Sequence, residues 1–88
     1  MENPKSYFVL TYQVTENYVE ARAPYRKEHL TLAHEFAEKG LLLGGAFEDP
    51  AEGALLCFYV SSPSVIEEFV RRDPYVRQGL IGNWKIRP

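Results

Sequence analysis

The chain has 88 residues, of which 45% are hydrophobic and 25% are charged, and its formal net charge is −2. This length allows one domain with a core that is only marginally stable by itself, so we expect residues 1–88 to form a single domain. The charge excludes the basic surface of a nucleic-acid-binding protein, and the single cysteine, Cys57, excludes a disulfide framework.

The first half of the chain predicts a strand, a polar connection and a helix. Aromatic and β-branched side chains predict a strand from Tyr7 to Val14. Residues Thr15 to Ala23 are polar and have room for a short helical turn. Pro24 suits the first position of a helix, which we expect over Tyr25 to Lys39, ended by Gly40. Its predicted apolar stripe consists of Leu30, Ala33, Phe36 and Ala37.

Two further strands are predicted in the middle of the chain. Residues Leu41 to Phe47 form the first, in which the pair Gly44-Gly45 indicates a bulge or a close backbone approach. Residues Glu48 to Gly53 have the composition of a turn. Residues Ala54 to Val60 are almost wholly apolar and predict the next strand.

The last part of the chain predicts a second helix, a short turn and a final strand. Ser62-Pro63 fits an N-cap followed by proline at the first helical position, and the helix is expected to reach about Arg72. The residue before a proline avoids the α region, so Asp73-Pro74 ends this helix. One more helical turn is expected over Tyr75 to Gly79, followed by a strand over Gly82 to Arg87.

The resulting order β-α-β-β-α-β is that of the ferredoxin-like split βαβ unit, an α+β fold. Right-handed crossovers place both helices on one face of a four-stranded antiparallel sheet. The other face is also rich in apolar side chains: Tyr7, Val9, Leu55, Cys57 and Tyr59. An apolar face of this size needs a cover, and a second copy of the chain is the expected one, in a homodimer or higher oligomer. The alternative is a monomer with an apolar sheet.

His29 is the first candidate for chemistry, because it follows Arg26 by three residues and Arg22 by seven. If the helical spacing extends back that far, the three side chains lie near one face. A histidine beside a buried stripe is suited to general acid–base work, and the two arginines are suited to binding an anion. The alternative is a histidine that only packs at the boundary, with arginines on a solvated face.

Asp73 is the second candidate. It fits an N-cap for the turn that begins at Pro74, and this role is compatible with a second one. One carboxylate oxygen could cap the turn while the other accepts the N–H of the His29 imidazole and fixes its tautomer. Tyr75 could offer its hydroxyl to a ligand or serve only in packing. Among the remaining reactive types, Cys57 lies in an apolar strand and is expected to be inert, and His34 falls on the polar side of its helix.

Three motifs in the same order resemble the YCII-related family. Arg22…Arg26-Lys27-Glu28-His29-Leu30 resembles its Arg-x-x-x-Arg-x-x-His-Leu, and Gly40-Leu41-Leu42-Leu43-Gly44-Gly45 resembles its glycine–leucine motif. Asp73-Pro74-Tyr75-Val76…Gly79 resembles its Asp-Pro-Tyr/Phe-Val…Gly, the most specific of the three. Ala46 departs from the pattern, because the family often has proline there. The resemblance implies a ferredoxin-like subunit that pairs through its open sheet face as a dimeric α/β barrel, with an active-site dyad that maps to His29 and Asp73.

Two functions follow from these expectations. The first is an enzyme without cofactor or metal, in which His29 and Asp73 transfer a proton, as a lyase or isomerase does, on a small anionic or phenolic ring compound. Arg22, Arg26 and Tyr75 would bind this substrate. The second is a dimeric module that binds a small ligand without reaction. Two histidines with no carboxylate cluster make a poor metal site. The polar first residues and the lack of a long apolar run lead us to expect a cytoplasmic protein with no membrane partner.

Overall fold

A computed structural model describes residues 4–15, 17–46 and 53–88 of the chain. The elements are β1 (Ser6–Val14), α1 (Tyr18–Ala21), a 3₁₀ turn (Ala23–Tyr25), α2 (Arg26–Ala37), β2 (Leu41–Ala46), β3 (Gly53–Val60), α3 (Ser64–Arg72), α4 (Pro74–Arg77) and β4 (Ile81–Arg87). The predicted order of strands and main helices is confirmed, and the expected short turns before α2 and after α3 are also present.

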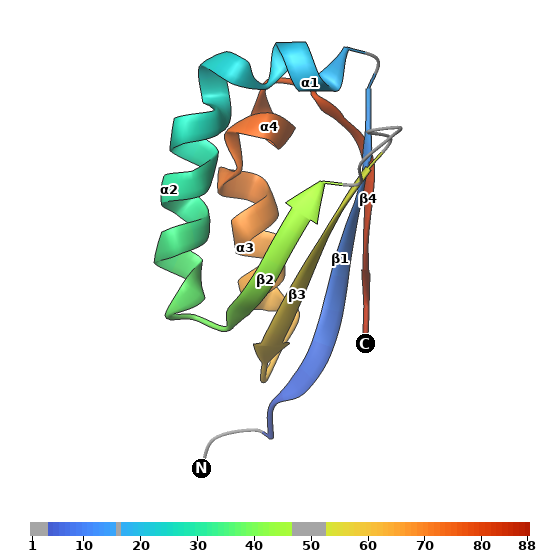
Figure 1. The fold of residues 1–88 in the computed structure, drawn as a ribbon. Coiled ribbons are helices and arrows are strands. Elements are labelled where there is room, and N and C mark those ends of the chain that lie inside the picture. The colour runs from blue at the N-terminus through green and yellow to red at the C-terminus, as the bar shows by residue number, and fades with distance from the viewer. Residues whose placement is uncertain (1–3, 16, 47–52) are drawn as a thin grey trace.

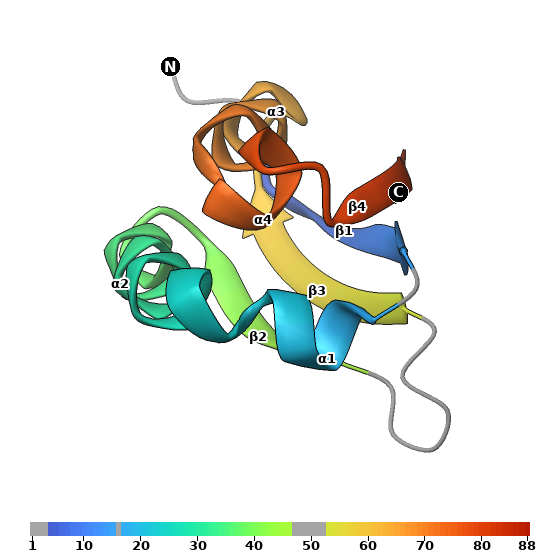
Figure 2. The same cartoon turned by 90° about the horizontal axis from the view of Figure 1, so that it is seen from above.

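The four strands form one antiparallel sheet in the order β2-β3-β1-β4. Both long helices, α2 and α3, lie on the same face of this sheet, and the opposite face is open (Figures 1 and 2). This is the predicted α+β ferredoxin-like arrangement. The short helices α1 and α4 sit at one end of the molecule, next to the N-terminal half of α2 and the last residues of β1 (Figure 1).

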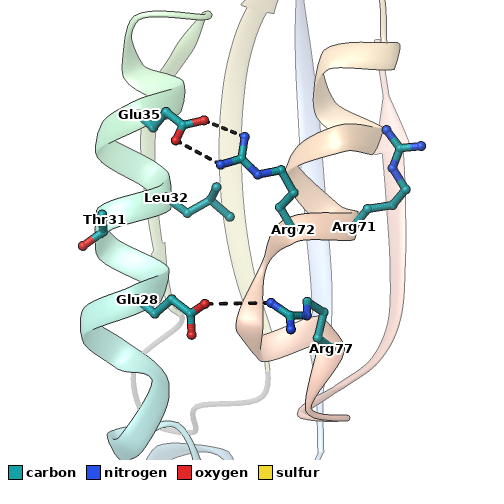
Figure 3. Close-up of a pocket in the computed structure, with 7 residues that line it drawn as sticks. All are labelled: Glu28, Thr31, Leu32, Glu35, Arg71, Arg72 and Arg77. Carbon is teal, nitrogen blue, oxygen red and sulfur yellow. Dashed lines mark hydrogen bonds and ion pairs between the residues drawn. The ribbon is translucent and has the colours of Figure 1, made fainter.

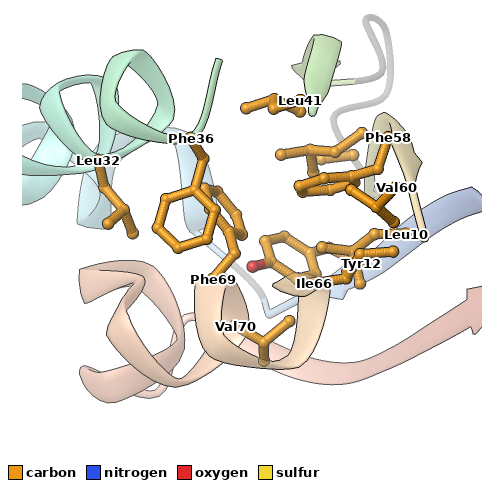
Figure 4. Close-up of a cluster of buried hydrophobic side chains, with 12 residues drawn as sticks. Leu10, Tyr12, Leu32, Phe36, Leu41, Phe58, Val60, Ile66, Phe69 and Val70 are labelled. Carbon is orange, nitrogen blue, oxygen red and sulfur yellow. The ribbon is translucent and has the colours of Figure 1, made fainter. Parts of the chain in front are cut away.

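The core lies between the sheet and the two long helices (Figure 4). Paired residues of antiparallel strands share a face, and the register pairs Leu10 with Leu56 and with Ile86 on the covered face. From the helices, Phe36 and Phe69 meet edge to face with ring centroids 5.3 Å apart, and Phe69 also meets Phe58 at 5.7 Å. Phe69 therefore links the middle of the core to α2.

The buried face of α2 differs from the predicted stripe. Leu32 and Phe36 are buried, whereas Leu30 is 43% exposed and Ala37 is exposed as well. Residues two positions apart on a helix point in nearly opposite directions, so a helix on a sheet cannot bury both Leu30 and Leu32. The inward row is spaced 29, 32, 33 and 36, which places His29 in the row itself rather than at its edge.

The predicted bulge in the second strand lies elsewhere. The register shifts between Leu41 and Leu43, not at the glycine pair. Gly44 does not show a close backbone approach either: the nearest atom to a Cβ placed there would be Cγ of the Leu56 side chain, at 3.0 Å. The predicted turn and the end of this strand fall on residues 47–52, outside the described part of the chain.

Both long helices have ends that local chemistry explains. Gly40 follows α2 with a φ of 118°, and a Cβ atom there would lie 2.5 Å from the carbonyl oxygen of Tyr59, so only glycine fits. Helix α3 begins at Ser64, one residue later than predicted. The Ser62 hydroxyl still accepts a hydrogen bond of 3.2 Å from the Ser64 N–H and so supports the first turn.

The open face of the sheet carries exposed apolar side chains. Tyr7 is 64% exposed, Leu43 62% and Tyr59 38%, and the register places Leu43 beside Cys57. The Tyr7 and Tyr59 rings lie 4.7 Å apart. None of the described helices has the length and apolar character needed to cross a membrane.

Candidate functional site

The buried carboxylate of Asp73 is the centre of the site. Asp73 has an extended backbone before Pro74, as expected for the residue that precedes a proline, and it is the N-cap of α4. Its Oδ1 atom accepts a hydrogen bond of 3.0 Å from the backbone N–H of Tyr75. Asp73 is 0% exposed, and among the described residues it is the one buried charged side chain. A buried charge is costly unless it is paired and hydrogen-bonded.

His29 lies in the first turns of α2 and reaches Asp73 directly. Its Nδ1 atom is 2.8 Å from Oδ1 of Asp73, and its side chain keeps 16% exposure. The structure therefore brings together the two residues that the sequence singles out. The expectation that one Asp73 oxygen caps the turn and the other faces His29 is wrong, because Oδ1 does both. The second oxygen, Oδ2, has another partner.

That partner is Tyr12, which was not among the candidate site residues predicted from the sequence. The Tyr12 hydroxyl donates a hydrogen bond of 2.8 Å to Oδ2 of Asp73, and Tyr12 is 3% exposed. Burial and the adjacent negative charge of Asp73 raise the pKa of Tyr12 far above its ordinary value, so its hydroxyl remains a donor. A signal was present in the sequence: Tyr12 is the polar-tipped side chain in the inward series Phe8, Leu10, Tyr12.

Two aromatic rings hold the imidazole in place. Tyr75 stacks on His29 with ring centroids 4.0 Å apart and an interplanar angle of 9°. Phe69 meets the imidazole edge to face at 6.2 Å. Burial raises the pKa of Tyr75; nearby Tyr18 and Asp73 add to this, while Arg22 and Arg26 oppose it. The packing role considered for Tyr75 is thus observed.

The two arginines act to lower the pKa of Tyr75 by their positive charge and make no hydrogen bond to the dyad among the described residues. The guanidinium carbon of Arg22 is 5.1 Å from the centroid of the Tyr18 ring. Arg26 is exposed and lines a shallow depression on α2 together with Lys27, Leu30 and His34. Both arginines supply positive charge near the site, consistent with their effect on the Tyr75 pKa.

The hydrogen bonds define what the imidazole can do. Asp73 accepts hydrogen bonds from Tyr12 and Tyr75 and is in contact with Nδ1 of His29, an arrangement that an ionised carboxylate satisfies when His29 is the donor. A carboxylate cannot donate, so the Nδ1 atom of His29 carries the proton. In the neutral ring the Nε2 atom then carries the free electron pair. This is the tautomer in which a histidine can take a proton from a bound molecule.

Two ion pairs on the outer surface join α2 to the elements that position Asp73 (Figure 3). Glu35 accepts two hydrogen bonds from Arg72, of 2.5 and 3.0 Å, and Glu28 lies 3.8 Å from Arg77. The bonds from Arg72 lower the pKa of Glu35. These residues line a groove of about 410 Å³ between the helices. The pairs are exposed, so their contribution is small and falls with salt.

The remaining reactive side chains lie apart from the dyad. Cys57 is on β3, paired with Val9 on the open face, and His34 is exposed on α2, as expected. Within the residues that the structure describes, no group of three His, Cys, Asp or Glu side chains is placed to hold a metal ion.

The fold and the site together define an α+β domain with a ferredoxin-like sheet and a buried Asp–His pair at one end. The model of the YCII-related domain family matches residues 6–88. The chain therefore belongs to the YCII-related family. A search of curated proteins found no match.

Solved structures with the same fold are distant in sequence. The chain superposes with a TM-score of 0.79 on 5-chloro-2-hydroxyhydroquinone dehydrochlorinase (TftG) from Burkholderia phenoliruptrix in complex with 2,5-dihydroxybenzoquinone, at 17% identity over 94% of this chain and 92% of that chain. A NIPSNAP family protein of unknown function from Agrobacterium tumefaciens gives 0.61, at 15% identity over 99% and 87%. PA3566 from Pseudomonas aeruginosa gives 0.58, at 14% identity over 98% and 92%. At these identities the likeness shows the fold alone.

Proposed function

We propose that this protein is a cofactor-independent enzyme that transfers a proton on a small anionic or phenolic ring compound. His29 is the general acid–base and Asp73 orients it. One observation carries the proposal: the 2.8 Å contact between Nδ1 of His29 and Oδ1 of Asp73, which leaves Nε2 as the basic atom of a partly exposed imidazole. A buried carboxylate behind the ring stabilises the imidazolium that forms when Nε2 takes a proton.

The proposed reaction is a lyase or isomerase step. Nε2 of His29 removes a proton from a ring carbon or hydroxyl of the substrate, and the electron pair moves into the ring. In a lyase a proton is returned to the carbon that carries the leaving group, and removal of a second hydroxyl proton then expels chloride from this tetrahedral carbon; in an isomerase the return of the proton at another carbon completes the reaction. The negative charge on the substrate oxygen is bound by Arg22, Arg26 and the Tyr75 hydroxyl, whose proximity is reflected in the Tyr75 pKa.

The comparisons give this proposal a substrate class to test. The name of one structural neighbour says that it dehydrochlorinates a chlorinated hydroxyhydroquinone, and its structure holds a dihydroxybenzoquinone. Such compounds are planar, phenolic and easily ionised, which suits a site with an imidazole base, aromatic walls and two nearby arginines. The proposal for this chain is the class of hydroxylated rings, with and without a halogen leaving group.

The test is a turnover assay on a panel of hydroxylated and chlorinated hydroquinones and small lactones, followed by ring absorbance and chloride release. We expect one of these to react, and His29→Ala to reduce kcat/KM by about a hundredfold or more. The matched control is His34→Ala, which removes the exposed imidazole on the same helix and should leave the rate unchanged. Equal rates for both variants would refute the role of His29. Tight binding with no turnover of any compound would favour the non-catalytic binding module.

We also propose that two copies pair through the open face of the sheet. The support is the exposed apolar side chains Tyr7, Leu43 and Tyr59 on that face. Burying a few hundred Å² of apolar surface on each copy contributes on the order of 10 kcal/mol before the costs of association.

A further inference from the structure

We propose that Tyr12 is a positioning residue for His29: its hydroxyl holds one oxygen of the buried Asp73 carboxylate and so fixes the rotation at which the other oxygen faces the imidazole. The inference rests on the proposed function of the His29–Asp73 pair. It concerns a residue that touches neither the imidazole nor a substrate and acts only through Asp73.

The geometry of Tyr12 suits this role. It lies on β1, a central strand, where Ala54 of β3 pairs with it on one side and Trp84 of β4 on the other. Its backbone is therefore held by two neighbours, and its ring is packed in the core at 3% exposure. From this fixed base the hydroxyl reaches Oδ2 of Asp73 at 2.8 Å. The sheet thus determines the rotation of a carboxylate that belongs to the helical layer.

The three donors to Asp73 come from different parts of the fold and divide its oxygens between them. The Tyr75 N–H and His29 Nδ1–H both meet Oδ1, while the Tyr12 O–H meets Oδ2. Without the Tyr12 hydroxyl, Oδ2 would lie in a site with 0% exposure and no donor among the described residues. A buried acceptor in that state either rotates toward another donor or takes a proton. Each response weakens the bond that selects the His29 tautomer.

Removal of the Tyr12 hydroxyl should change the pH at which the neutral, Nδ1-protonated imidazole of His29 is lost. Loss of a donor to the ionised carboxylate favours the protonated form of Asp73. The charge no longer shared with Tyr12 also favours a protonated His29. Because of both changes, the neutral, Nδ1-protonated imidazole is lost, as the pH is lowered, at a higher pH in a Tyr12→Phe variant than in the unmodified protein.

Other titratable or charged groups near the pair are left intact by this substitution. They are Tyr18 on α1, Arg22 just after it, Arg26 on α2 and Tyr75 on α4. Helix α3 contributes the uncharged Phe69 ring. A shift in the variant is therefore attributable to the missing hydroxyl.

The test is ring nitrogen NMR of the two histidines as the pH is lowered. His34 is exposed and serves as the internal reference, because the chain has only these two imidazoles. We expect the signal of the unprotonated Nε2 of His29 to be lost at a higher pH in Tyr12→Phe than in the unmodified protein. Tyr59→Phe, which removes a hydroxyl on the open sheet face, should behave as the unmodified protein. A folded Tyr12→Phe with an unchanged His29 profile would overturn the inference.

A second substitution keeps the test decisive if Tyr12→Phe does not fold. Site-specific 3-fluorotyrosine at position 12 has nearly the same shape but a more acidic hydroxyl, which donates more strongly. The signal of the unprotonated Nε2 of His29 should then persist to a lower pH, and a shift in the opposite direction or no shift contradicts the inference. The readout needs no substrate, so a failure to find turnover would count against the proposed function and leave the positioning role to be decided by the imidazole signals.

Discussion

The imidazole of His29 lies almost parallel to the ring of Tyr75, with centroids 4.0 Å apart and an angle of 9° between the planes. The same Tyr75 provides the backbone N–H that binds Oδ1 of Asp73 at 3.0 Å. One residue therefore contacts both side chains of the pair, His29 through its ring and Asp73 through its main chain. Most of the contacts that position the His29 and Asp73 side chains therefore come from the short segment Asp73-Pro74-Tyr75.

Substitutions of Tyr75 should separate its ring from its hydroxyl. Tyr75→Phe keeps the stack on His29 and loses the group beside Arg22 and Arg26, so we expect a higher KM with kcat nearly unchanged. Tyr75→Leu also loses the stack, and we expect kcat to fall by about tenfold, in line with the roughly 0.5–1.5 kcal/mol of an aromatic pair. Steady-state kinetics on the reacting compound measure both effects. Identical kcat values for the two variants would contradict a role of the stack in catalysis.

Substitutions of Asp73 should separate charge from hydrogen bonding. In Asp73→Asn the amide oxygen can still accept from Tyr75 and His29, and the amide nitrogen can donate to the Tyr12 oxygen. We expect a loss of only about 1 kcal/mol in the free energy of unfolding, with kcat/KM reduced by about a hundredfold or more because the imidazolium loses its counter-charge.

Asp73→Ala provides the contrast. It leaves the buried Tyr12 hydroxyl and the Tyr75 N–H without their acceptor and removes the N-cap of α4. Each loss costs about 1–3 kcal/mol, so we expect this variant to be less stable than Asp73→Asn by roughly 2 kcal/mol or more. Urea unfolding of both variants decides the matter. Equal stability would mean that the carboxylate is not the acceptor for these donors.

Much of the fold could be predicted because its signals are local. Gly40, in the turn that follows α2, has a positive φ, and Asp73-Pro74 both ends α3 and begins α4. These backbone preferences belong to one or two residues, although the clash that excludes other residues at Gly40 also involves Tyr59. His29 and Asp73 are 44 positions apart in the chain. Their pairing was indicated by the family motifs and not by residue spacing alone.

The remainder could not be predicted because it depends on tertiary packing. Leu30 and Leu32 have the same side chain, and only the docking of α2 on the sheet decides that Leu32 is buried. The role of Tyr12 depends on a contact over 61 positions. In the sequence only its polar hydroxyl distinguishes it from the apolar side chains in the inward series of the strand. The partner of that hydroxyl, Asp73 at the end of α3, is known only from the tertiary structure.

The buried phenol of Tyr12 makes stability fall in alkaline solution. Its pKa in the folded chain lies well above the ordinary value of about 10, because burial and Asp73 oppose its ionisation. The stabilisation is fully present below about pH 10, and it is lost as the pH rises further, because the unfolded chain then releases a proton that the folded chain retains. The expected slope is about 1.4 kcal/mol per pH unit for this group.

Urea unfolding between about pH 9 and 11.5 measures this slope. Tyr12→Phe has no proton to retain at position 12, so its stability should fall less steeply by about one proton equivalent. A residual slope is expected from Tyr75, whose pKa is raised in the same direction. Parallel curves for the variant and the unmodified protein would mean that the Tyr12 hydroxyl is not held in the buried network.

The last prediction concerns the oligomeric state of variants of the proposed dimer. Leu43 is 62% exposed on the open face of the sheet, and Leu30 is 43% exposed on the outer side of α2. If two copies meet through their sheets, Leu43→Glu buries a charge in the interface and should yield a monomer, because an unpaired buried charge costs several kcal/mol. Leu30→Glu makes the same chemical change on the opposite layer and should leave the dimer intact. Light scattering during gel filtration gives the molar mass of each. A dimer that survives Leu43→Glu, or one that Leu30→Glu dissociates, would show that the copies do not pair through the sheet.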